Sequence, residues 1–72
     1  MKYIYIIEQA GDGSYSAYVP DLPGCVAVAK TRARVKRLIR EAIHLHLEDM
    51  RERGEPIPKP TAASEFVEFQ PA

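Results

Sequence analysis

The sequence predicts an α+β fold with the element order β-β-β-α-β, in which one long helix packs on one face of a sheet. Three observations lead to this fold class. Three short apolar segments, separated by turns rich in glycine and proline, precede residue 30. The apolar spacing then changes to that of a helix. A final apolar segment follows a proline-rich linker and predicts a fourth strand.

The first predicted strand covers residues 2–8 and is rich in isoleucine and tyrosine. Both of its faces are apolar, which favours a central strand covered on both sides. Gly11 and Gly13 then lie in a predicted hairpin turn. The return strand covers residues 14–19 and ends at Pro20, because proline has no N–H to donate to a strand ladder.

A type II turn is predicted next, with Pro23 and Gly24 as its central pair. In such a turn glycine supplies the positive φ that other residues avoid. A third strand follows over residues 25–30. Strands joined this closely predict a three-stranded antiparallel meander.

The predicted helix begins after Thr31, a suitable N-cap, and ends at Gly54. Its apolar arc consists of Val35, Leu38, Ile39, Ala42, Ile43, His46, Leu47 and Met50. An extended linker over residues 55–60 leads to the fourth predicted strand, residues 65–69. One helix covers one sheet face only, so part of the other face is predicted to remain open for a partner.

With 72 residues, the chain is expected to form a single domain, residues 1–72, with a small core. Its one cysteine excludes an internal disulfide, and no set of cysteines and histidines has zinc spacing. Oligomerisation is the remaining way to stabilise so small a core, so we expect a homodimer or higher homo-oligomer. The sequence shows no signal peptide or membrane span, and a lone free thiol favours the cytoplasm.

Catalytic readings find little support in the sequence. Cys25 opens an apolar strand, where a small buried hydrophobe is expected rather than a nucleophile. Asp12 and Asp21 lie in turns, and the strand interiors supply no cluster of carboxylates for two metals. His46 lies in the apolar arc, and a hydrogen-bonded, partly buried imidazole is favoured there over a metal ligand or base. We therefore predict neither an enzyme nor a cofactor or metal site.

Charge is distributed unevenly along a chain whose net charge is zero. Residues 30–40 contain no acid and six cations, Lys30, Arg32, Arg34, Lys36, Arg37 and Arg40. Positive charge at the start of a helix opposes the helix dipole. The run is either a solvated face, with its distal cations paired to helix acids such as Glu41, or a surface for phosphate or an acidic protein.

Two segments, in this order and spacing, resemble the HicB-like antitoxin family over nearly the whole chain. The first, D-G-x-Y-x-A-x-V-P-D-L-P-G-C, runs from Asp12 to Cys25. The second, EAIHLHLEDMRERGEPIPKP, runs from Glu41 to Pro60. The resemblance implies a partial ribonuclease H-like fold without the ribonuclease carboxylates. It also implies a protein that neutralises a small HicA-like toxin, which cleaves mRNA with a histidine of its own, by covering the toxin's active site.

This resemblance makes the segment from Asp12 to Cys25 a candidate partner surface, to which we expect Asp12, Tyr15 and Asp21 to contribute. The sequence departs from the family in two respects. It resembles a short form that lacks the DNA-binding module found in many relatives. Many relatives also have a glycine before the helix and an acidic first helical turn, and here VAVAKTRARV replaces that segment with bulkier and positively charged residues. The alternative is an orphan HicB-like domain that binds nucleic acid through residues 30–40, with contacts from Lys30, Arg32, Arg34, Lys36 and Arg37. A degenerate, metal-dependent nuclease acting through Glu8 or Asp21 is a third hypothesis.

Overall fold

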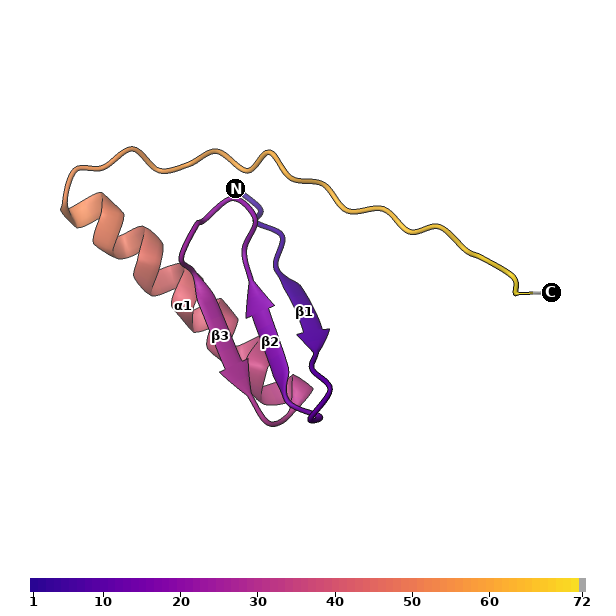
Figure 1. Ribbon diagram of the computed structural model, residues 1–72. Coiled ribbons are helices and arrows are strands. Elements are labelled where there is room, and N and C mark those ends of the chain that lie inside the picture. The colour runs from indigo at the N-terminus through magenta and orange to yellow at the C-terminus, as the bar shows by residue number, and fades with distance from the viewer. Residues whose placement is uncertain (72) are drawn as a thin grey trace.

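A three-stranded antiparallel sheet and one long helix make up the body of the protein (Figure 1). The computed structural model describes residues 1–71. The elements, in chain order, are β1 (Ile6–Gln9), β2 (Tyr15–Tyr18), β3 (Val26–Ala29) and α1 (Arg32–Glu52). The sheet order is β1-β2-β3, with both pairs antiparallel. The predicted α+β class and the meander are therefore confirmed.

β1 is shorter than predicted and lies at an edge of the sheet. Its pairing with β2 begins at Ile6, opposite Tyr18. Beyond Tyr18 the chain leaves the ladder, because a turn closes where the Leu22 N–H donates to the Val19 carbonyl over 3.1 Å. Residues 2–5 consequently have no β2 residue to pair with. The expectation that this strand is central was wrong for the chain on its own.

Two glycines hold the turns of the meander. Gly13 has a φ of 90° in the hairpin between β1 and β2. Gly24 has a φ of 85°, and the Cys25 N–H donates to the Leu22 carbonyl over 3.1 Å. This combination confirms the predicted turn around Pro23 and Gly24, with glycine at the position that needs positive φ.

Both ends of α1 follow from local capping. The Thr31 side chain accepts a hydrogen bond of 3.1 Å from the Arg34 N–H, one of the donors that the first turn leaves free. At the other end Gly54 has a φ of 72°. Its N–H donates to the Arg51 carbonyl and the Glu55 N–H donates to the Met50 carbonyl, which is the Schellman pattern. The predicted helix limits are confirmed.

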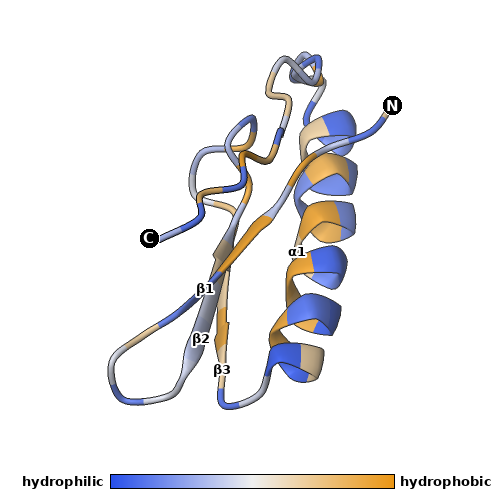
Figure 2. Ribbon diagram, turned by 90° about the vertical axis from the view of Figure 1, so that its right-hand side faces the viewer, coloured by the Kyte–Doolittle hydropathy of each residue, from blue (hydrophilic) through white to orange (hydrophobic). Residues whose placement is uncertain are grey.

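The core lies between α1 and one face of the sheet (Figure 2). Its buried residues are small or medium-sized: Ala17, Val19, Leu22, Cys25, Ala29, Val35 and Ile39. Directly paired residues share a face, so Ile7, Ala17 and Ala27 face the helix together.

Within residues 1–71 no helix or strand covers the opposite face of the sheet, and the sequence predicted that part of this face would stay open. A row of paired residues crosses it, formed by Ile6, Tyr18 and Val26. Val26 is 62% exposed, and Val28, two residues along β3, is 67% exposed. We call this surface the uncovered sheet face.

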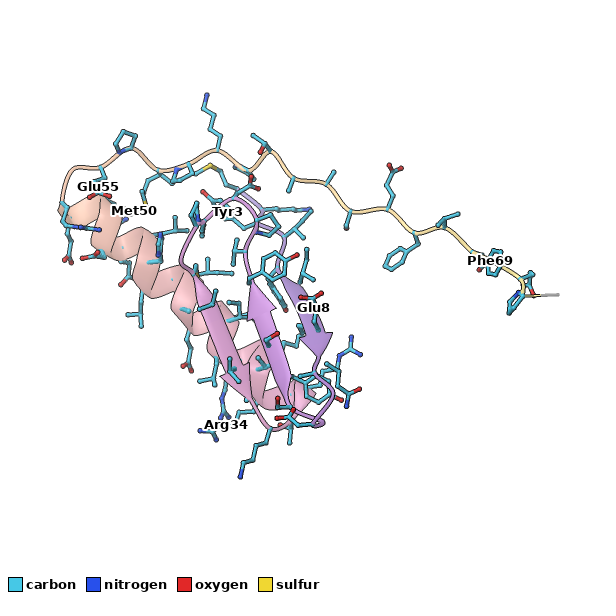
Figure 3. All side chains as sticks on the ribbon, in the orientation of Figure 1. Tyr3, Glu8, Arg34, Met50, Glu55 and Phe69 are labelled. Carbon is cyan, nitrogen blue, oxygen red and sulfur yellow. The ribbon has the colours of Figure 1, made fainter. Side chains whose placement is uncertain are left out.

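The predicted fourth strand does not form within residues 1–71. Residues 55–71, which we call the arm, run extended across one end of the sheet and then away from the body (Figure 1). Phe66 is 100% exposed and Phe69 is 83% exposed, and Figure 3 shows Phe69 far from the sheet. A strand needs a neighbour to satisfy its backbone hydrogen bonds, and this segment has none among the residues that the structure describes.

Candidate partner-binding surfaces

Asp21 is the residue that holds the arm to the body. Its carboxylate accepts hydrogen bonds from the Thr61 hydroxyl at 2.7 Å, the Thr61 N–H at 3.1 Å and the Ala62 N–H at 3.1 Å. These bonds, that from the Thr61 hydroxyl above all, lower the pKa of Asp21 because they favour its ionised form. The sequence made Asp21 a candidate for contact with a partner, and in this chain its carboxylate is occupied by the arm.

A second attachment lies closer to the helix. The Tyr3 hydroxyl donates to the Pro58 carbonyl, and Tyr3 itself packs against the core (Figure 3). Residues 2–5, which lack a strand partner, are thus held partly by the arm. Sequence reasoning missed Tyr3, Thr61 and Ala62, because no local pattern signals a contact between segments so far apart in the chain.

Asp12 lies at the tip of the β1–β2 hairpin, at the other end of the sheet. Its carboxylate accepts hydrogen bonds from the Ser14 hydroxyl at 2.6 Å and the Ser14 N–H at 2.9 Å. Both bonds, the first more strongly, lower the pKa of Asp12. Asp12 and Lys30 line one shallow depression, where the hairpin tip approaches the end of β3. The carboxylate thus has a local structural role and remains exposed to a partner.

Tyr15 is partly buried and packs against the core on the helix side of the sheet. The three candidate contact residues are therefore not brought together. Asp12 and Asp21 lie at opposite ends of β2, and Tyr15 belongs to the inner face.

The cations of residues 30–40 are all exposed and cover the first half of α1. Lys36, Arg37, Arg40 and His44 line a depression on the outer side of the helix, together with Ala33 and Glu41. The ion pairs seen within residues 1–71 join Arg53 to Asp49 at 2.8 Å and to Glu55 at 3.3 Å. The hypothesis that the helix acids neutralise this run therefore gains no support, and its positive charge is open to an anion.

Cys25 is buried, and its desolvation raises the pKa of the thiol. A raised pKa opposes formation of the thiolate that a nucleophile needs. No group of three or more histidine, cysteine, aspartate or glutamate side chains within residues 1–71 is placed to hold a metal ion. His46 is partly buried, as the helical spacing predicted, and His44 is exposed.

The uncovered sheet face exposes apolar side chains, Val26 and Val28 most of all. Ile6 and Tyr18 lie beside one another in one row of this face, and Glu8 shares the face two residues further along β1 (Figure 3). Tyr18 is 39% exposed. An apolar patch with an aromatic side chain and a flanking carboxylate has the composition of a protein-binding surface rather than of a reaction centre. In the part of the chain that the structure describes, no helix is both long and apolar enough to span a membrane.

Comparison with known proteins gives a consistent result. A family model described as the HicB-like antitoxin of bacterial toxin–antitoxin systems matches residues 3–71. The chain is 40% identical to a UPF0150 protein of Thermoplasma acidophilum over 62 residues, which cover 86% of this chain and 90% of that protein. It is 44% identical to a UPF0150 protein of Archaeoglobus fulgidus over 48 residues, covering 67% of this chain and 70% of that one.

A relative from a virus is longer. The chain is 36% identical over 67 residues to a 14.9 kDa protein of the rep–hol intergenic region of Haemophilus phage HP1. The match covers 93% of this chain and 50% of the phage protein. The similarity therefore extends through the arm as well as the sheet and helix.

Proposed function

Because the chain belongs to the HicB-like antitoxin family of bacterial toxin–antitoxin systems, we propose that it binds a small HicA-like toxin and keeps mRNA away from the toxin's active site. The observation that supports this proposal is the uncovered sheet face, an apolar surface on which no helix or strand of residues 1–71 packs. Occlusion of a partner requires such a surface and requires no reacting group in the antitoxin itself.

The β1–β2 half of the uncovered sheet face is the proposed toxin-binding surface. It combines Ile6 and Tyr18 with the carboxylate of Glu8, and the exposed carboxylate of Asp12 lies beyond it at the hairpin tip. Exposed carboxylates around an apolar patch suit a basic partner, and an RNA-cleaving protein must carry positive charge to hold its substrate. A lone reduced thiol suits the cytoplasm, where mRNA is found.

The test is a pair of binding and cleavage assays with the HicA-like protein of the same host. The chain is expected to form a stoichiometric complex with the toxin and to stop its cleavage of mRNA. Tyr18→Ser is expected to weaken both effects, because it removes the aromatic side chain from the proposed surface. Leu45→Ser is the matched control, since Leu45 is 67% exposed on α1, away from the sheet. Failure of the unaltered chain to bind or inhibit the toxin would refute the proposal.

A second candidate function rests on the unpaired cations of α1. Exposed Lys36, Arg37 and Arg40 have no carboxylate within ion-pair distance among residues 1–71, which favours an anionic ligand such as RNA or DNA. Lys30, Arg32 and Arg34 extend the same positive region toward β3.

Fluorescence anisotropy with a labelled RNA tests this candidate. Binding is expected to weaken steeply with added salt, because each neutralised phosphate releases counterions. Arg37→Glu should weaken it strongly, whereas Arg53→Glu should not, since Arg53 already pairs with Asp49 and Glu55. Absence of binding at low salt would exclude this function.

Self-association is also proposed, because the core of the single chain is small. None of the buried residues within residues 1–71 is aromatic. A chain of this length gains stability from a second copy more readily than from its own interior. The purified chain is therefore expected to have at least twice the mass of 8.1 kDa in solution.

A further inference from the structure

The far half of the arm exposes apolar side chains to an unusual degree. Val67 is 93% exposed, between Phe66 at 100% and Phe69 at 83%. The bonds from Asp21 fix the chain at Thr61 and Ala62, and the residues that follow project on the side of the sheet opposite α1 (Figure 2). Large apolar side chains presented together on a held, extended segment indicate a surface that another protein covers.

The edge of the sheet at β3 also exposes groups that another strand could cover. β3 ends the strand order, so the backbone groups on its outer side have no strand partner in the described part of the chain. Val26 and Val28 are two residues apart and both face the uncovered side. On the arm, Val67 and Phe69 are also two residues apart, and an extended segment would place both on one face.

We infer that residues 65–69 of one copy add as an antiparallel strand to β3 of a second copy, with Val67 beside Val28. This inference rests on the self-association proposed above and assigns the surfaces that produce it. In this register Phe69 lies beside Val26, and aromatic and β-branched neighbours of this kind stabilise a sheet. Phe66 lies beside Ala29, on the side of the sheet that faces α1.

Charge favours the β3 edge over the corresponding antiparallel register at β1. The same register places Glu65 beside Lys30, a cross-strand pair of opposite charge. Antiparallel pairing with β1, with Val67 beside Ile6, would place Glu65 beside Glu8 instead. Two carboxylates directly opposite one another destabilise a strand pair.

The arm cannot reach its own β3 in this register while Asp21 holds it. Asp21 precedes β3, so Ala62 is fixed at the Val26 end of the strand. Glu65 would have to lie at the Lys30 end, about 13 Å further along the strand. Three residues span at most about 11 Å when fully extended. The strand therefore comes from a second copy, and the two copies can exchange arms symmetrically.

Disulfide trapping tests the register. One chain carries Val28→Cys and a second, of different tagged length, carries Val67→Cys, both with Cys25→Ala. Mild oxidation of the mixture is expected to link the two chains to each other, with little linkage in either chain alone. A mixture of Ile6→Cys and Val67→Cys chains examines the β1 edge in the register described above. Preferential linkage there, or no linkage between any chains, would overturn the inference. Repeating the experiment with native Cys25, which is buried, guards against a folding defect caused by its replacement.

Light scattering on the purified chain, without any toxin, tests the role of the arm. The unaltered chain is expected to be a dimer or larger, and Val67→Glu with Phe69→Glu is expected to be a monomer. Ala63→Glu with Gln70→Glu is the matched control, with the same added charge outside the pairing segment, and should retain the oligomer. An oligomer that survives in the Val67/Phe69 variant would refute the arm exchange and leave self-association standing. A monomeric unaltered chain would refute both the arm exchange and self-association. The proposed toxin-binding function would still be decided by the separate measurement of toxin inhibition.

Discussion

Asp21 and Thr61 are joined by two hydrogen bonds, although forty residues separate them in the chain. The Thr61 hydroxyl and N–H both donate to the Asp21 carboxylate, and the Ala62 N–H adds a third bond. This contact fixes the arm at the turn between β2 and β3. It determines where the exposed apolar residues of the arm begin and in which direction they project.

Replacing Asp21 is expected to release the arm without unfolding the body. In Asp21→Ala, hydrogen exchange at the Thr61 and Ala62 amides should rise toward the rate of a free peptide, because their acceptor is gone. Amides within α1 should keep their protection. Asp12→Ala is the matched control, since it removes a carboxylate from a different turn. Unchanged exchange at Thr61 in Asp21→Ala would show that the arm is held by other contacts.

The same contact should depend on pH. The hydrogen bonds hold the pKa of Asp21 below its ordinary value of 3.8, so they stabilise the docked arm fully at neutral pH. As the pH falls through the lowered pKa, the carboxyl becomes protonated and this stabilisation is lost. The Thr61 amide shift, followed by NMR, should titrate with a midpoint below 3.8. A midpoint at or above that value would contradict the bonding described for Asp21.

The core should be sensitive to the loss of a single methyl group. Ile39 is fully buried between α1 and the sheet, so Ile39→Val is expected to lower the free energy of unfolding by about 0.5–1.5 kcal/mol. Leu45→Ala, on the exposed side of the same helix, should change it by less than about 0.5 kcal/mol. Urea denaturation measures both. Equal losses for the two variants would mean that α1 is covered on its outer side as well.

The turn before β3 depends on the backbone freedom of Gly24. Its φ of 85° is disfavoured for residues with a Cβ, so Gly24→Ala is expected to destabilise the chain by about 1–2 kcal/mol. Gly11→Ala is the control, because Gly11 lacks positive φ and a Cβ there meets no atom within 4 Å. That change should be neutral or stabilise the chain by about 0.4–1 kcal/mol. The melting temperatures of the two variants, measured by thermal unfolding, should shift in opposite directions, or the shift for Gly24→Ala should be clearly the larger.

Local signals predicted the elements of the body well. Thr31 and Gly54 cap the two ends of α1, and Pro23 and Gly24 form the turn that their types require. Each of these features involves backbone groups within a few residues of one another. A short stretch of sequence is therefore enough to predict them.

The arm could not be predicted in the same way. Residues 65–69 have the composition of a strand, yet a strand forms only where a neighbouring backbone is in reach. The hydrogen bonds that Thr61 and Ala62 donate to Asp21 determine which backbone the segment can reach, and they depend on the folded arrangement of distant segments. The prediction that residues 2–8 form a central strand failed for a related reason. Apolar residues on both faces of a strand indicate that both faces tend to be buried, but they do not indicate which other segment or chain packs against them.

The attachment at Asp21 makes the arm equivalent to a peptide ligand tethered to its own receptor. Tethering gives the bound segment a high effective concentration, so a few hydrogen bonds suffice to keep it in place. A free peptide with the sequence of residues 56–70 would lack this advantage and should compete only when present in large excess. Cutting the chain after the exposed Arg53 would likewise turn a stable attachment into a weak, dilutable complex.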